Sequence, residues 1–179
     1  GISISHPQEI SDKILELKDR HDSIFVSSAN WHRQKRLKEN TEFFLRNSKE
    51  NDCLIVMGSN PDYCIDDPRI YYTGSLSHDI CMQVFAIADW MIHLAWLDHC
   101  PNVVVEALSQ ACPVICTNSG GTSEIVGDNG IIIPEDTPYD FMLTDYDTPY
   151  ELSVKKITLP KVDVSYSHLK IENIAKRYI

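Results

Sequence analysis

Six short apolar runs, each ended by a turn or a polar break, constrain the fold of this 179-residue chain more than any other feature. They are rich in Ile, Val and Tyr, and most lack the apolar–polar alternation of a half-exposed strand. Such runs are typical of strands that are covered on both faces of a parallel sheet. The runs are residues 23–29, 53–58, 69–73, 90–96, 113–117 and 130–133.

Stretches with helical spacing of apolar residues lie between and around these runs. Alternating strands and helices predict βαβ units with right-handed crossovers. The expected fold class is therefore α/β: a doubly wound, Rossmann-like parallel sheet of about six strands with helices on both faces. We predict a surface excursion over residues 135–151, where prolines interrupt any periodic pattern. The predicted helices are residues 8–20, 33–47, 76–88, 102–110 and 167–179.

Length and charge narrow the class of protein. A chain of 179 residues that is 43% hydrophobic and 23% charged is enough for a single domain, residues 1–179, but too short for two α/β domains. The net charge of −10 argues against a nucleic-acid partner, which needs a basic surface. No apolar run approaches the roughly 20 residues that a transmembrane segment needs. The chain begins at Gly1 rather than at Met, which we read either as the remnant of a tag or as the sign of a piece of a longer protein.

The cysteines bear on the compartment and on metal binding. No two of them form a C-x-x-C pair, and three lie inside apolar runs, as buried thiols do. We therefore expect reduced thiols and a cytoplasmic protein. Cys112 and Cys116, even with His93 and His99, do not form the closed four-ligand pattern of a structural zinc site, so no metal site is predicted. The six cysteines are Cys53, Cys64, Cys81, Cys100, Cys112 and Cys116.

The loops that follow the predicted strands are the places to look for a ligand site, because open α/β sheets bind ligands beyond the carboxyl ends of their strands. One strand ends at Trp96, and the loop after it contains Asp98. A helix then begins near Asn102 and carries Glu106 in its second turn. The unpaired N–H groups at such a helix start favour phosphate oxygens.

This segment resembles the donor-binding region of retaining glycosyltransferases with the GT-B fold, the large group 1 or family 4-like class. Their hallmark is an acidic residue, seven residues, and then Glu, a spacing that Asp98 and Glu106 have here. The surrounding motifs are present as well, and their order makes the resemblance specific. The resemblance covers residues 23–134 and is strongest after Ala88. The motifs are Pro101-Asn102, Glu106-Ala107-Leu108, Pro113-Val114, Gly120-Gly121, Glu124-Ile125-Val126 and Gly130.

The resemblance implies roles for individual residues. Asp98 and Glu106 become the candidate catalytic residues: Glu106 is expected to bind ribose hydroxyls and Asp98 to hold hydroxyls of the donor sugar. Relatives usually have Glu at the first position, so Asp98 is one methylene shorter and has a different reach. Gly120 and Gly121 let the backbone approach a ligand closely. Further candidate donor contacts in this segment are His99, Pro101 and Asn102.

Two earlier loops complete the expected donor site by resemblance. Relatives supply an Arg and, five residues later, a Lys for the donor diphosphate; here Lys35 matches the Lys, but Asn30 stands at the Arg position. Asn30 can donate a hydrogen bond but brings no charge, so the phosphate site is weakened unless Arg33 or Arg36 substitutes. Later in the chain, Gly74 and Ser75 are expected near the nucleotide base, and Ser75 could instead cap the following helix.

Each of these residues also has a structural interpretation. Asp98 could cap a helix start, and Glu106 could be an acid favoured by the helix dipole. The basic cluster at residues 33–38 could be a solvated helix face. His93 lies inside a predicted strand and is expected to be a core residue. Residues 145–147 have the D-x-D form of a metal-binding motif, but in an acidic loop we expect a solvated charge cluster.

The resemblance implies that the chain is the donor-binding half of a metal-independent glycosyltransferase that uses no separate cofactor. Its donor would be a UDP- or GDP-sugar and its acceptor a glycan, lipid or protein. The acceptor half, an N-terminal domain, is absent from this chain, so the domain is expected to be inactive alone. The absent half could also attach the whole enzyme to the surface of a membrane. Two alternatives are a non-catalytic scaffold domain, favoured by Asn30 and Asp98, and a related epimerase.

Overall fold

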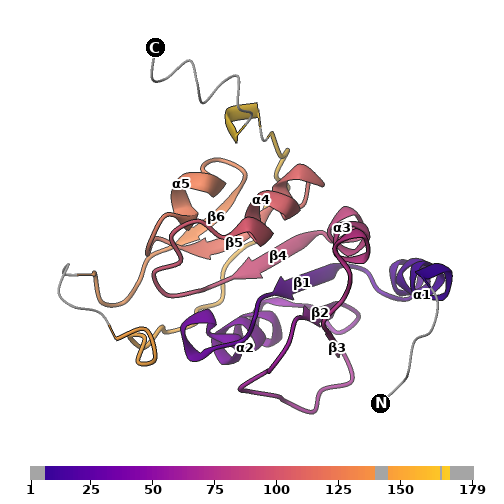
Figure 1. Ribbon diagram of the computed structural model, residues 1–179, viewed down its shortest axis with the longest axis horizontal. Helices are drawn as coiled ribbons and strands as arrows, with labels where there is room; N and C mark the ends of the chain where they lie inside the picture. The colour runs from indigo at the N-terminus through magenta and orange to yellow at the C-terminus, as the bar shows by residue number, and fades with distance from the viewer. Residues whose placement is uncertain (1–6, 140–144, 166, 170–179) are drawn as a thin grey trace.

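A single parallel sheet of six strands organises the computed structural model, which describes residues 7–139, 145–165 and 167–169 (Figure 1). The strand order is β3-β2-β1-β4-β5-β6, and every neighbouring pair is parallel. This confirms the predicted doubly wound α/β fold. The strands are β1 (Ile24–Ser28), β2 (Cys53–Met57), β3 (Ile70–Gly74), β4 (Trp90–His93), β5 (Val114–Thr117) and β6 (Gly130–Ile133).

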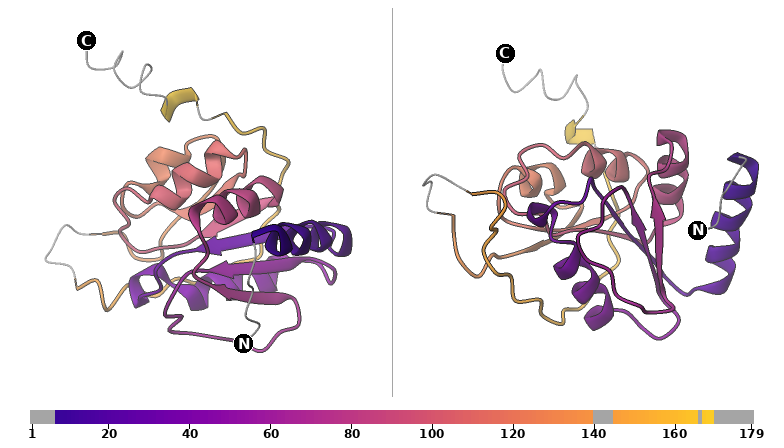
Figure 2. Two further views of the ribbon diagram at one scale, coloured as in Figure 1. Left: turned by 45° about the vertical axis from the view of Figure 1, so that its right-hand side comes forward. Right: turned by 60° about the horizontal axis from the view of Figure 1, so that its bottom comes forward.

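Helices cover both faces of the sheet (Figure 2). On one face, α1 (Pro7–Arg20), α3 (His78–Ile87), α4 (Asn102–Ser109) and α5 (Thr122–Val126) pack over a core that includes Val26, Ile55 and Met91. On the other face, α2 (Leu37–Asn47) contributes Phe43 and Phe44 to a second core. The central strands β1, β2, β4 and β5 are buried at every position, which explains why their sequences do not alternate.

The strand order reverses between β1 and β4, which pair side by side although they lie far apart in sequence. β1 continues on one side into the β2 unit, and β4 continues on the other into the β5 unit. The loops that leave these two strands therefore diverge to opposite faces, and the carboxyl edge between them is where open α/β sheets bind ligands. The chain places Lys35 after β1 and Asp98 after β4.

Several predicted boundaries differ in the structure. The helix predicted over residues 33–47 is split into a 3-10 turn, Arg33–Lys35, and α2, because Arg36 has a left-handed backbone with φ 53°. The strand predicted over residues 90–96 ends at His93, and α3 begins behind Ser77, so Ser75 is not its cap. The short helix α5 was not predicted; its five residues are too few to show a helical period.

The segment after β6 is not simply a surface excursion. Glu135 and Tyr150 both bind the buried Arg36, so the chain is anchored to the core at these two residues. Residues 152–165 then run without helix or strand; Leu152 is buried in the α2-side core, while Val164 packs on the opposite core. Of the helix predicted over residues 167–179, a 3-10 turn, Ser167–Leu169, is seen, and residues 170–179 lie outside the described part.

Within the described residues, no helix combines the length and the apolar character required for a membrane span.

Candidate donor-binding site

The loop of residues 97–101, between β4 and α4, is held by the loop that follows β5. The Leu97 amide donates to Ser119 Oγ at 3.2 Å, and the Gly121 amide donates to the Asp98 carbonyl oxygen at 3.0 Å. Thr122 Oγ1 donates to the same carbonyl at 3.2 Å. Leu97 has φ 48°, a left-handed conformation that costs a non-glycine residue about 1–2 kcal/mol. The surrounding contacts therefore fix the path of the loop after β4 and, with it, the position of Asp98.

Gly120 and Gly121 make this close packing of the two loops possible. A Cβ atom on Gly120, whose φ is +69°, would collide with the backbone of Leu97 and Asp98. A Cβ atom on Gly121 would collide with the carbonyl oxygen of His99. The close approach that these glycines permit in this structure is between two loops of the chain itself; their contact with a ligand stays a prediction.

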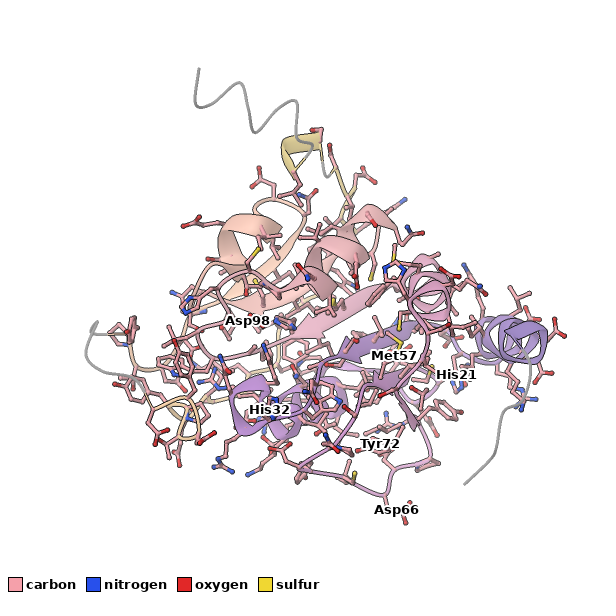
Figure 3. The ribbon with its side chains drawn as sticks, viewed as in Figure 1. His21, His32, Met57, Asp66, Tyr72 and Asp98 are labelled. Atoms are coloured by element: carbon pink, nitrogen blue, oxygen red, sulfur yellow. The ribbon has the colours of Figure 1, made fainter. Side chains whose placement is uncertain are left out.

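The Asp98 side chain lies near the tip of β4 (Figure 3). Its carboxylate binds two basic side chains. Lys35 Nζ lies 2.5 Å from Asp98 Oδ2, and His93 Nε2 lies 3.1 Å from the same oxygen. The three residues come from the turn after β1, the loop after β4 and the last position of β4. The carboxylate is largely buried, with 13% of the side chain exposed, and His93 is buried to 4% exposure. Lys35 and Asp98, both expected in the donor site from the sequence, thus lie in contact with each other.

Two opposing effects set the pKa of the Asp98 carboxyl. Burial alone would raise this pKa, but hydrogen bonds from His93 and Lys35, and the charges of these groups, outweigh burial and lower it to about 2. Asp98 is therefore ionised at neutral pH and presents a carboxylate, which accepts hydrogen bonds and donates none.

The lowered pKa of Asp98 predicts a pH dependence of stability. Because this pKa is lower in the folded than in the unfolded chain, the ion pair stabilises the fold above pH 4, and that stabilisation is lost as pH falls from about 4 to about 2. The expected contribution is about 2 kcal/mol. Measured by urea unfolding across this pH range, the free energy of unfolding should fall less steeply in Asp98→Asn than in the wild type. The matched control is Asp19→Asn, at an exposed position of α1, and its free energy of unfolding should fall with pH as steeply as that of the wild type. Equal slopes of the free energy of unfolding against pH in all three proteins would contradict the prediction.

The amino terminus of α4 is open. Its N-cap residue is Pro101, and no side chain caps the first turn, so Asp98 is not a helix cap. Glu106 lies in the second turn, 28% exposed, with Oε1 3.4 Å from Nε2 of His78 at the start of α3. Uncapped N–H groups and the helix dipole make this terminus, with the exposed Asn102, suited to an anion. Contact between Glu106 and Asp98 is not among the described interactions.

The remaining candidates lie in the loops after β1 and β3. Asn30 is exposed, and its Oδ1 accepts a hydrogen bond from Ser59 Oγ at 3.0 Å. Gly74 ends β3 with φ +70° and has open space where a Cβ would stand. Ser75 follows it and is exposed. Both residues are exposed near the carboxyl edge of the sheet, and their contact with a nucleotide base stays a prediction.

Arg36 does not lie at the donor site. Its guanidinium forms two hydrogen bonds with Glu135, at 2.7 and 3.0 Å, and donates to the Tyr150 carbonyl oxygen at 2.6 Å. It also lies over the ring of Trp96, 5.4 Å from the ring centre. This buried network occupies the charge of Arg36, so the hypothesis that Arg36 substitutes for the missing phosphate-binding Arg is wrong.

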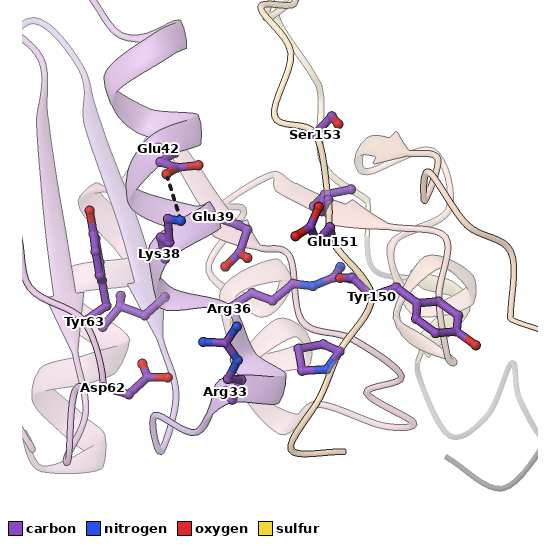
Figure 4. A pocket seen from close by; sticks show the side chains of 13 residues that line it. Arg33, Arg36, Lys38, Glu39, Glu42, Asp62, Tyr63, Tyr150, Glu151 and Ser153 are labelled. Atoms are coloured by element: carbon purple, nitrogen blue, oxygen red, sulfur yellow. Dashed lines mark hydrogen bonds and ion pairs between the residues drawn. The ribbon is translucent and has the colours of Figure 1, made fainter. Parts of the chain in front are cut away.

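Arg33 lines a cavity of about 340 Å³ between α2 and residues 149–153 (Figure 4). Cationic and acidic side chains face each other around it; Lys38 pairs there with Glu42 at 3.8 Å. Neither Lys35 nor Asp98 lines this cavity, so Arg33 is not brought to the Lys35–Asp98 pair through it. A role for Arg33 in donor binding stays a prediction.

His93 is a site residue whose role sequence reasoning missed. The expectation of a buried strand histidine is confirmed, but its ring also binds the Asp98 carboxylate. Its position at the carboxyl end of a strand beside the switch point was the available signal. Asp145, in turn, accepts hydrogen bonds from Asp147 N and Thr148 Oγ1, which gives the acidic loop a turn, while Tyr146 contacts the exposed His99 at 3.2 Å.

Comparison with known proteins agrees with this geometry. The family described as glycosyl transferases group 1 matches residues 20–143. N-acetyl-alpha-D-glucosaminyl L-malate synthase of Bacillus anthracis is 26% identical over 124 residues, which cover 62% of this chain and 32% of that enzyme.

Solved structures support the fold independently of sequence. Anabaena Alr3699/HepE in complex with UDP-glucose matches with a TM-score of 0.60 and 18% identity over 73% of this chain and 40% of its own. WaaG, a glycosyltransferase of lipopolysaccharide biosynthesis, matches with a TM-score of 0.56 and 18% identity over 76% of this chain and 40% of its own. The chain thus spans about a third to two fifths of the length of these relatives. With its doubly wound sheet, its Asp98–Glu106 spacing and a family match over more than half of its length, the chain belongs to the group 1 glycosyl transferases.

Proposed function

We propose that this chain is the donor-binding domain of a retaining glycosyltransferase, which transfers a sugar from a nucleotide diphosphate to an acceptor glycan, lipid or protein. The observation that carries the proposal is the meeting of Lys35 and Asp98 at the β1–β4 switch point, beside the uncapped start of α4. A cation, a carboxylate and a positive helix end at one edge of the sheet match a donor that has phosphates and hydroxyl groups.

Each group has a part in the proposed complex. The donor diphosphate lies at the amino terminus of α4 and takes a charge-assisted hydrogen bond from Lys35. Glu106 accepts hydrogen bonds from ribose hydroxyls, and Asp98 from hydroxyls of the sugar. The backbone at Gly74 and Ser75 lies against the base. The proposal assigns neutralisation of the phosphates to Lys35 and the helix, with no metal ion.

The comparisons suggest which donors to test first and whether activity needs more than this domain. The UDP-glucose complex of Anabaena HepE supports UDP-sugars as the first donors to test, with GDP-sugars as the second. Because this chain spans two fifths or less of its relatives, we propose that the acceptor site and turnover need a further domain. The six cysteines are free thiols, which supports a cytoplasmic location.

The proposal is tested by measuring the affinity of the 179-residue chain for UDP, GDP and their sugars by calorimetry and thermal shift. Saturable stabilisation by one nucleotide series is expected. Lys35→Ala and Glu106→Ala should each weaken binding about tenfold or more, the usual effect of losing a hydrogen bond to a charged group. Lys38→Ala, which removes an exposed neighbouring lysine paired with Glu42, is the matched control and should bind as the wild type does.

A scaffold domain without catalysis is the second candidate, and one observation favours it. Arg36 is committed to Glu135, and Asn30 is uncharged, so Lys35 is the sole Lys or Arg that the described residues bring to Asp98. If no nucleotide or nucleotide sugar in the panel shifts the melting temperature, the scaffold function replaces the donor-site proposal.

A further inference from the structure

We propose that His93 is a positioning residue that keeps the Asp98 carboxylate aimed at the donor sugar when Lys35 turns to the donor phosphates. This inference rests on the proposed function. His93 does not touch the donor in this scheme; it acts through Asp98. Its hydrogen bond to Asp98 is an observed contact of 3.1 Å.

Both partners of Asp98 bind the same oxygen. Lys35 Nζ and His93 Nε2 each contact Oδ2, at 2.5 and 3.1 Å. Among the described interactions, none engages Oδ1. The two contacts therefore fix the rotation of the carboxylate and leave one oxygen available to accept a hydrogen bond from a ligand hydroxyl.

The two partners are held to very different degrees. His93 is 4% exposed and ends β4, where it pairs with Cys116 of the neighbouring strand. Lys35 is 20% exposed and lies in a 3-10 turn, with a flexible four-carbon side chain. His93 is thus a fixed donor to Asp98, whereas Lys35 can change partner without moving a strand.

Donor binding sets these two contacts in competition. A diphosphate at the start of α4 offers Lys35 more negative charge than one carboxylate does, so Lys35 shifts toward the phosphates. Asp98 then keeps the hydrogen bond from His93. With His93 removed and Lys35 at the phosphates, no described side chain donates to the Asp98 carboxylate, which is then free to rotate. Its hydrogen bonds to the sugar hydroxyls are lost, while the contacts to the phosphates persist.

The inference is tested by comparing the affinity of the 179-residue chain for UDP-glucose with its affinity for UDP, and for GDP-mannose with GDP. In the wild type, the donor that binds should bind more tightly than its nucleotide. In His93→Leu, this ratio of affinities should fall toward one, a loss of about tenfold, while affinity for the bare nucleotide changes less than about threefold. His93→Gln, whose amide can donate to Oδ2, should restore the ratio.

The outcomes separate the two proposals. If the wild type binds none of the four ligands, the donor-site function itself fails. If the wild type binds a nucleotide and His93→Leu weakens nucleotide and nucleotide sugar equally, His93 acts on the fold alone and this inference is overturned. It is also overturned if the wild-type ratio is already one, or if His93→Leu keeps the wild-type ratio. Circular dichroism and the urea midpoint of both variants check that they are folded.

Discussion

Replacing Arg36 with alanine should lower the free energy of unfolding by about 3–5 kcal/mol, the usual cost of breaking a buried ion pair from one side. The guanidinium side chain is fully buried, and the Glu135 side chain is 3% exposed. Removing Arg36 leaves the Glu135 carboxylate, as well as the Tyr150 carbonyl oxygen, without a partner away from water. The measurement is urea unfolding followed by circular dichroism at neutral pH.

Two further variants give this prediction its control. Arg33→Ala removes an exposed arginine three residues away and should change stability by less than about 0.5 kcal/mol. The double variant Arg36→Met/Glu135→Leu replaces the pair with apolar side chains and should recover much of the lost stability. A single Arg36→Ala variant as stable as Arg33→Ala would show that the Arg36–Glu135 network contributes nothing to the fold.

Gly121→Ala should disrupt the fold and, under the proposed function, donor binding as well. The new Cβ would meet the carbonyl oxygen of His99, a backbone atom that can move only if the loop of residues 97–101 moves with it. That movement breaks the hydrogen bond from Gly121 N to the Asp98 carbonyl and pulls Asp98 away from Lys35. We expect a loss of about 3 kcal/mol or more in the free energy of unfolding, within the range for overpacking and backbone strain.

Gly74→Ala is the control for the effect of the methyl group itself. Gly74 also has a positive φ, of 70°, but its Cβ position is open, so the expected cost is the conformational one of about 1–2 kcal/mol. Urea unfolding compares the two variants, and proton NMR of the His93 ring reports whether Asp98 still contacts it. Equal stability of Gly121→Ala and Gly74→Ala, with unchanged His93 resonances, would rule out the proposed loop displacement.

The sheet and its helices could be predicted because their causes are local. Burial on both faces produces the mainly apolar, non-alternating sequences of β1, β2 and β5, and helical spacing marks α3 and α4. The placement of Lys35 and Asp98 at one edge of the sheet followed from the rule for carboxyl ends of parallel strands together with the family pattern, but their ion pair was not predicted. Apolar runs and helical spacing are read from neighbouring residues, without knowledge of distant contacts.

What sequence reasoning missed depends on distant partners. Arg36 turns inward because Glu135, 99 residues later, meets it in the core, and nothing near Arg36 in sequence indicates that partner. Arg36 also has a left-handed backbone, and this splits the predicted helix. Residues 152–165 lack helical or strand pattern, so their path from the α2-side core to the opposite core was not predictable either.

The separation of the two site loops along the chain has a kinetic consequence. Lys35 and Asp98 are 63 residues apart, and their contact needs β1 and β4 to pair across the intervening β2–β3–α3 segment. Closure of so long a segment is slow compared with helix formation or hairpin-like local contact. If the proposed function holds, recovery of nucleotide affinity during refolding from urea should therefore trail the recovery of helical circular dichroism.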